Sequence, residues 1–269
     1  MKKSIFVALS LLLATACGEE ANQELLSIDF EKITPDVERI LNSGEGERVG
    51  GIDGIEVVEG VGYNGSKGLV VTYIGEDIGS RRYVATIPLA QRCTEATLNF
   101  RVMFEDDFQF VKGGKLHGLG PKNRVTGGKD MHPEGWSTRI MFSKENTIVP
   151  YIYNQNKEGR FGISPKPDEH FIETGKFHDI AMYVKINSPV EQANGYYEIW
   201  LNGEMISSVD NLQLRTKESE ESQIYDFLFS TFYGGRAPEW APKNPDGSYA
   251  TCHARFDDFL VTKGKYIRK

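Results

Sequence analysis

Residues 137–153 predict a β-hairpin, one face of which gathers side chains that are able to do chemistry together. Two alternating segments flank a short polar loop, and this spacing sets Ser137 opposite Tyr153 and Arg139 opposite Tyr151. Because successive side chains of a strand point to opposite faces, these four side chains share one face. Such a face is typical either of ordinary surface decoration or of a site that binds a charged substrate.

A run of basic residues just before this hairpin indicates an anionic ligand. No acidic residue occurs between Phe108 and Lys129, although the whole chain has 38 acidic and 31 basic residues and a net charge of −7. A local positive strip in an acidic protein attracts anions, whereas the overall charge disfavours a general nucleic-acid binder. The strip contains Lys112, Lys115, Lys122, Arg124 and Lys129, together with His117.

These residue types suit β-elimination from a uronic-acid polymer. The C5 proton of a uronate lies α to a carboxylate and becomes acidic only when a neighbouring cation or hydrogen-bond donor stabilises the developing charge. A phenol beside Arg or Lys is expected to have a lowered pKa and to act as the base, and the same or a second phenol protonates the departing O4. Lysine, arginine and paired tyrosines therefore suffice without a metal.

Other kinds of site find less support in the sequence. Hydrolysis of a sugar polymer requires two positioned carboxylates, which this face lacks. The five histidines lack the close spacing of a zinc site, no glycine-rich phosphate-binding motif occurs, and Ser137 lies in a strand rather than on a nucleophile elbow. We therefore expect no metal and no cofactor, and the alternatives to a lyase are a non-catalytic carbohydrate-binding sandwich and a hydrolase.

The elements that must position these residues are β-strands. Apolar and polar residues alternate over 97–104, 180–186 and 227–233, and Asn202-Gly203 between two further segments is a strong hairpin signal. No helical stripe of useful length competes with this pattern. Many alternating strands joined by glycine-rich turns predict an all-β fold, a β-jelly roll or two-sheet antiparallel β-sandwich.

The N-terminal residues predict export. Two lysines, an apolar run ending at Leu13 and small residues before Cys17 describe a signal peptide over residues 1–16, which is too short to span a bilayer. The cysteine follows a segment that looks like a bacterial lipobox. We therefore expect lipidation at Cys17 and a protein anchored at the bacterial cell envelope through that lipid alone.

The remaining chain is expected to form a monomer with one folded domain. Residues 17–50 are polar and acidic and predict a lipidated tether and N-terminal segment, and residues 51–269 predict a single β-jelly-roll domain. Cys93 and Cys252 are able to pair in an oxidising compartment, and the sequence does not decide whether they do.

Ordered motifs along the chain resemble polysaccharide lyase family 14. They are FVKGGKLHGL at 110–119, GWSTR at 135–139, YIY at 151–153 and STFYGG at 230–235. The family comprises alginate and glucuronate lyases with a β-jelly-roll fold. The resemblance covers roughly residues 80–262 and implies eliminative cleavage of an anionic polysaccharide in an open cleft.

Carried onto this chain, the resemblance implies a catalytic set of Lys115, Ser137, Arg139, Tyr151 and Tyr153. Arg139 and Lys115 would neutralise the uronate carboxylate, and Ser137 would orient it. Tyr151 or Tyr153 would abstract the proton and deliver one to O4, with Lys115 left open as the alternative base. Further substrate contacts are expected from Lys112, His117, Gln155 and Tyr233.

The paired phenols also bear on the choice of substrate. In mannuronate the C5 hydrogen and O4 lie on the same side of the ring, so that a single tyrosine is able to act as base and acid. Guluronate places them on opposite sides and needs two separated groups. Two phenols on one strand face favour polymannuronate, with glucuronan as the second choice, and endo or exo action is left open.

Overall fold

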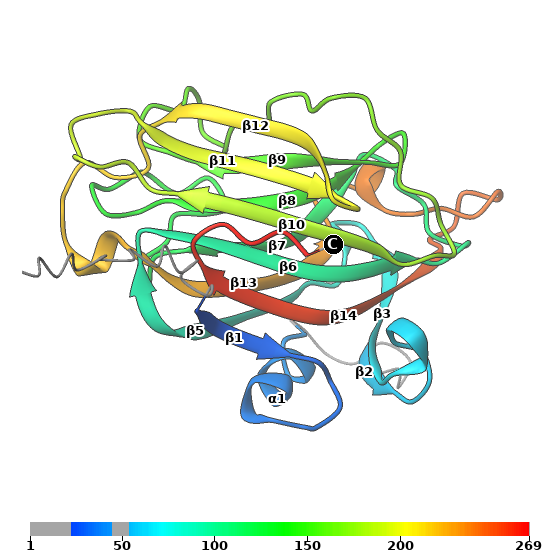
Figure 1. Ribbon diagram of the computed structural model, residues 1–269. Coiled ribbons are helices and arrows are strands. Elements are labelled where there is room, and N and C mark those ends of the chain that lie inside the picture. The colour runs from blue at the N-terminus through cyan, green and yellow to red at the C-terminus, as the bar shows by residue number, and fades with distance from the viewer. Residues whose placement is uncertain (1–22, 45–53, 269) are drawn as a thin grey trace, which may run out of the picture.

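The computed structural model describes residues 23–44 and 54–268 (Figure 1). The strands are β1 (Glu24–Ile28), β2 (Ile55–Val58), β3 (Gly68–Glu76), β4 (Gly79–Ser80), β5 (Tyr83–Cys93), β6 (Glu95–Phe104), β7 (Gly114–Gly120), β8 (Ser137–Ser143), β9 (Thr147–Tyr153), β10 (His178–Lys185), β11 (Gly195–Leu201), β12 (Glu204–Leu212), β13 (Ile224–Tyr233) and β14 (Thr251–Lys263). The helices are α1 (Pro35–Leu41) and the 3₁₀ turns η1 (Tyr63–Gly65), η2 (Glu220–Ser222) and η3 (Pro238–Trp240).

Two antiparallel sheets pack face to face (Figure 1). Among the described strands, nine form one sheet in the order β12-β11-β10-β6-β14-β3-β2, with β1 beside β14 and β4 beside β3. Five form the other sheet in the order β5-β13-β7-β8-β9. The expected all-β, two-sheet antiparallel sandwich is confirmed.

The core lies between the two sheets and follows from the alternation of the strands. On β6, the side chains of Leu98, Phe100, Val102 and Phe104 are fully buried. Burial of one such side chain stabilises the fold by about 1.5–3 kcal/mol, so that a single strand face supplies a substantial share of the stability.

The hairpin expected at Asn202-Gly203 connects β11 to β12. Asn202 has a φ of 51° and Gly203 a φ of 83°. Both values lie in the left-handed region that a two-residue hairpin turn requires, which asparagine and glycine tolerate best. The turn chemistry of this dipeptide therefore determines where the two strands meet.

The N-terminal segment ahead of residue 51 contributes a strand and a helix that pack on the sandwich. Strand β1 pairs with β14, with Leu26 opposite Val261. Helix α1 begins after Thr34, whose hydroxyl accepts from a backbone N–H in the first turn, and it buries Ile40. These elements are too short for their periodicity to stand out in a polar sequence. The predicted signal peptide over residues 1–16 and the predicted lipidation at Cys17 fall outside the described residues.

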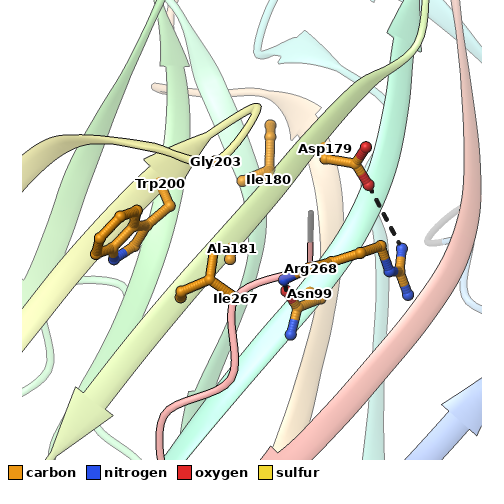
Figure 2. A pocket seen from close by; sticks show the side chains of 8 residues that line it. All are labelled: Asn99, Asp179, Ile180, Ala181, Trp200, Gly203, Ile267 and Arg268. Carbon is orange, nitrogen blue, oxygen red and sulfur yellow. Dashed lines mark hydrogen bonds and ion pairs between the residues drawn. The ribbon is translucent and has the colours of Figure 1, made fainter.

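The chain after β14 crosses the outer face of the nine-stranded sheet (Figure 2). The Asn99 amide donates to the Tyr266 carbonyl over 3.0 Å and accepts from the Arg268 N–H over 3.0 Å. Arg268 also lies 3.8 Å from the Asp179 carboxylate. The hollow between this tail and the strands leaves no space for a water molecule.

Two further sequence questions are answered in the described part of the chain. Cys93 on β5 and Cys252 on β14 are both buried and both free, so the structure contains no disulfide between them. No helix in residues 23–44 or 54–268 has the length and apolar character needed to cross a membrane.

His117 lies inside the sandwich, which corrects its expected role in substrate binding. Lys115 pairs with Met141 but Gly118 pairs with Arg139, so that β7 carries one extra residue between these pairs. Such a β-bulge shifts the alternation of side chains. The imidazole consequently turns inward and stacks on the Phe229 ring at a centroid distance of 4.7 Å.

This burial makes the free energy of unfolding depend on pH. Burial lowers the pKa of His117 to about 3, well below its ordinary value of about 6.5. Between these values the unfolded chain binds a proton that the folded chain does not, so acid favours unfolding. Stability that is fully present above pH 6.5 is therefore lost as the pH falls, at about 1.4 kcal/mol per pH unit for this group.

We expect His117→Phe to remove this contribution, because the phenyl ring fills the same aromatic cluster without titrating. Between pH 6 and pH 4 the free energy of unfolding, measured with denaturant, should fall less steeply in the variant than in the parent. Above pH 7 the two proteins should show the same slope, which serves as the internal control. Equal slopes between pH 4 and 6 would contradict the buried neutral imidazole.

Candidate functional site

The outer face of the five-stranded sheet carries the side chains that the hairpin pattern predicted. In the observed register Ser137 faces Tyr153 and Arg139 faces Tyr151, as expected. Strand β7 adds Lys115 beside these strands. The structure thus brings Lys115, Arg139, Tyr151 and Tyr153 together on this face, and we call these four residues the site cluster. The first three side chains are partly exposed, whereas Tyr153 is buried.

Gly118 makes room for Arg139 on this face. The two residues are cross-strand partners on β7 and β8. A Cβ atom at Gly118 would lie 2.6 Å from Arg139 Cγ and 2.1 Å from the Thr138 carbonyl oxygen. Only glycine therefore lets the arginine side chain lie across β7, and this explains one of the glycines in the 110–119 motif.

Lys115 is held in a partly buried position next to a phenol. Its Nζ lies 3.1 Å from Met141 Sδ and 4.0 Å from the centre of the Tyr151 ring. Burial, followed by the charges of Arg139 and Arg82, lowers the pKa of Lys115 to about 7. A substantial fraction of this amine is therefore neutral near neutral pH, and a neutral amine is able to accept a proton.

Arg139 supplies a second cation without a counter-ion. It forms no ion pair with any described carboxylate, and its Nε has no hydrogen-bond partner. Burial and the charge of Arg124 lower the pKa of Arg139 to about 10, so the guanidinium keeps its charge at neutral pH. Buried charges usually have a partner of opposite charge. Because Lys115 and Arg139 have no such partner among the described residues, the two groups are suited to bind an anion.

The two phenols are linked to each other. Their hydroxyl oxygens lie 3.2 Å apart, and the Tyr153 hydroxyl accepts from the Gly128 N–H over 2.9 Å. Burial and the neighbouring Tyr153 raise the pKa of Tyr151, and the opposing effects of the Gly162 backbone and Arg139 are smaller. The expectation that nearby cations lower the pKa of this phenol is therefore wrong for Tyr151, because burial outweighs them.

Ser137 and Gln155 support the site rather than facing an open cleft. The buried Ser137 hydroxyl donates to the Val125 carbonyl over 2.7 Å. The Gln155 amide nitrogen lies within 2.9 Å of the His132 and Gly135 carbonyl oxygens. Both side chains thus fasten the 121–136 connection to the sheet. They were expected to contact the substrate, but in the structure they position this connection instead.

Lys112 and Tyr233 have partners outside the site cluster. The Lys112 ammonium is exposed and lies 3.5 Å from the Glu239 carboxylate. Tyr233 follows the outward-facing Phe232 on β13, so its ring points into the core, and its hydroxyl donates to the Gln109 carbonyl over 2.6 Å. Tyr233 is therefore a core residue and not a substrate contact.

The structure adds three neighbours to the expected site residues. Met141 contacts Lys115, and its position two residues after Arg139 on the same strand face was the available signal. Arg124 belongs to the basic strip, and it pairs with Asp226 at 3.5 Å. Arg82 precedes β5, and its charge lowers the pKa of Lys115. No local sequence pattern indicates this interaction.

No group of His, Cys, Asp or Glu residues within 23–44 and 54–268 is arranged to hold a metal ion. The chemistry available at the site cluster is instead that of an amine, a guanidinium and two phenols. These groups bind an anion, accept a proton and donate a proton. Together with the β-sandwich, they define a class of protein that binds and processes anionic polymers.

Comparisons with known proteins identify the family. The sequence profile of polysaccharide lyase 14 matches residues 67–252. The chain therefore belongs to polysaccharide lyase family 14 and is a polysaccharide lyase. A search of curated proteins gives no match.

Solved structures share the fold at low sequence identity. The alginate lyase Aly36B is 20% identical over 93% of this chain and 100% of its own, with a TM-score of 0.68. The alginate lyase from Aplysia kurodai is 21% identical over 90% of this chain and 100% of its own, with a TM-score of 0.67. The endo-β-1,4-glucuronan lyase from the fungus Trichoderma reesei is 18% identical over 90% of this chain and 96% of its own, with a TM-score of 0.58.

The close approach at Gly118 generates a stability prediction. We expect Gly118→Ala to lower the free energy of unfolding by about 1–3 kcal/mol, because the added methyl group must displace Arg139 or the β8 backbone. Gly120→Ala on the same strand is the matched control, since its Cβ would meet neighbours at no less than 3.4 Å. Thermal and denaturant unfolding of both variants measure the difference, and equal losses would contradict this packing argument.

Proposed function

We propose that this protein cleaves a 1,4-linked uronate polymer by metal-independent β-elimination at the site cluster, with mannuronate in alginate as its first substrate. The observation that carries the proposal is the pair of unpaired, partly buried cations beside two linked phenols. Lys115 and Arg139 attract a carboxylate, and Tyr151 and Tyr153 line the same face. A uronate polymer presents a carboxylate on every sugar and thus matches this face.

Lys115 is the base in this proposal. Its lowered pKa of about 7 leaves a neutral amine available at working pH, and an acid–base catalyst works best when its pKa lies near that pH. Tyr151 is less suited to this role, because its raised pKa keeps the phenol protonated. Among the bases that sequence reasoning left open, these two pKa shifts support the lysine.

Tyr151 is the proton donor in this proposal, and Arg139 binds the carboxylate. Lys115 Nζ removes the C5 proton, and the electron pair of the broken C–H bond forms the C4=C5 double bond. The C4–O4 bond breaks, and O4 leaves with the hydroxyl proton of Tyr151. The Arg139 guanidinium stabilises the charge that develops on the carboxylate during this transfer. Return of the proton from the lysine ammonium to the phenolate, through solvent, restores both groups.

The arrangement of Lys115 and Tyr151 favours a substrate with same-side geometry. The amine lies over the ring of the phenol at 4.0 Å, so base and acid approach the sugar from one side. Mannuronate places the C5 hydrogen and O4 on one side of the ring. Glucuronate differs from mannuronate only at C2 and shares this geometry, which makes glucuronan the second candidate.

Complexes of a similar structure support a uronate ligand. Aly36B has been solved with an alginate tetrasaccharide as a variant lacking a lysine and a tyrosine. It has also been solved with an alginate trisaccharide as a variant lacking a lysine and a methionine. These are the residue types that Lys115, Tyr151 and Met141 contribute here.

A polymer panel tests the substrate. We expect polymannuronate to yield unsaturated oligosaccharides, detected by near-ultraviolet absorbance and mass spectrometry, because it offers same-side geometry. Polyguluronate should react at least tenfold more slowly, since opposite-side elimination needs two separated groups. Reaction of glucuronan alone would reassign the substrate while keeping the chemistry. Saturated products from every polymer would contradict the elimination mechanism.

The pH dependence tests the base. We expect kcat/KM to rise about tenfold per pH unit below 7 and to level above it, because the lysine must be neutral to accept a proton. The bound carboxylate favours the ammonium, so the corresponding rise in kcat should lie at higher pH than the rise in kcat/KM. Initial rates between pH 5 and 9 measure both profiles.

Lys115→Arg is the matched variant for this experiment. It keeps the positive charge but does not deprotonate at these pH values, so we expect a rate loss of about 10²–10⁴-fold with retained binding to an alginate gel. An active arginine variant with an unchanged acid limb would show that another group is the base.

A further inference from the structure

An arginine-lined cavity lies beside the site cluster at the β5 and β13 end of the five-stranded sheet. It has a volume of about 220 Å³ and is lined by Glu76, Ile78, Arg81, Arg82 and Arg236. Three of these five described side chains carry a guanidinium group, and one carries a carboxylate. The cavity is thus polar and rich in arginine, with the half-exposed Ile78 as its apolar wall.

Arg82 connects this cavity to the site cluster. Its guanidinium carbon lies 5.1 Å from the centre of the Phe232 ring, and Phe232 is the cross-strand partner of Lys115. Its Nη2 donates to the Gly235 carbonyl over 3.4 Å, next to Arg236 in the sequence. One outward-facing aromatic ring therefore separates the arginine-lined cavity from the catalytic lysine.

We propose that this cavity is a subsite for the carboxylate of a second uronate residue in the same polymer, beyond the sugar that is cleaved. The inference rests on the proposed function and extends it from one sugar to several. Paired arginine N–H groups match a carboxylate geometrically and electrostatically. The volume corresponds to roughly seven water molecules, enough for a carboxylate with part of its sugar ring.

The subsite extends the polymer path across the strands. A chain bound at Tyr151 on β9, Arg139 on β8 and Lys115 on β7 passes over Phe232 on β13 and then reaches Arg82. Short oligosaccharides that fill only the site cluster do not reach the cavity. Long ones gain the additional charge-assisted contacts, so that affinity should depend on chain length and on salt.

Arg236→Gln tests the subsite, because this side chain is exposed and its loss leaves the sheets intact. We measure kcat/KM on oligomannuronates from the trimer to the octamer. In the parent protein kcat/KM should rise with length, and the variant should lose about tenfold on the longest substrates while matching the parent on the shortest. The advantage of the parent should also shrink as salt is added.

Arg255→Gln is the matched control, since it removes the same charge from the outer face of the other sheet, where Arg255 pairs with Glu105. It should leave the length dependence unchanged. Arg82→Gln should reduce the gain from length and also move the acid limb of the pH profile to higher pH. An equal loss on substrates of every length, or no loss in Arg236→Gln, would overturn the subsite.

The two proposals fail in different ways. Absence of unsaturated product from every polymer with the parent protein overturns the proposed function. The subsite is then tested by retardation in alginate-containing native gels, where weaker retardation of Arg236→Gln than of Arg255→Gln supports it. Equal retardation of the two variants overturns it.

Discussion

Two cations held side by side on an open sheet without a counter-ion determine how this site works. Burial lowers the pKa of both Lys115 and Arg139, and the charge of Arg139 lowers that of Lys115 further. No described carboxylate forms an ion pair with either group. Removing charge from water is costly unless it is paired. In the proposed function an anionic substrate supplies the missing partner, so that a polyanion binds here although the protein has a net charge of −7.

The surrounding fold holds this unfavourable arrangement in place. The bulge in β7 sets Lys115 and Gly118 on the outer face, and the missing side chain of Gly118 leaves a place for Arg139. From the other sheet, the Tyr197 hydroxyl donates to the Arg139 carbonyl over 3.0 Å. Because these supports belong to the core and to the ladder of strands, the cations cannot separate without disturbing the sandwich.

The sequence predicts this site as far as strict alternation applies and no further. The β8–β9 hairpin has no irregularity between its paired residues, so the positions of Arg139, Tyr151 and Tyr153 were predictable from spacing. His117 was not, because one extra residue in β7 reverses the face and no local signal marks the bulge. Ser137 lies on the predicted face, but the 121–136 connection covers it, and a fold-back of that kind cannot be inferred from a single strand.

The pKa shifts show a further limit of reasoning from residue types. Cations beside a phenol suggest a reactive tyrosinate, yet burial acts on both groups at once and raises the pKa of Tyr151 while it lowers that of Lys115. At neutral pH the phenol keeps its proton and a large fraction of the amine lacks one, which is the pairing that an eliminating enzyme needs. Arg139 remains charged under the same conditions. In the proposed mechanism the two groups therefore have different roles: the guanidinium holds the carboxylate, and the amine takes the proton.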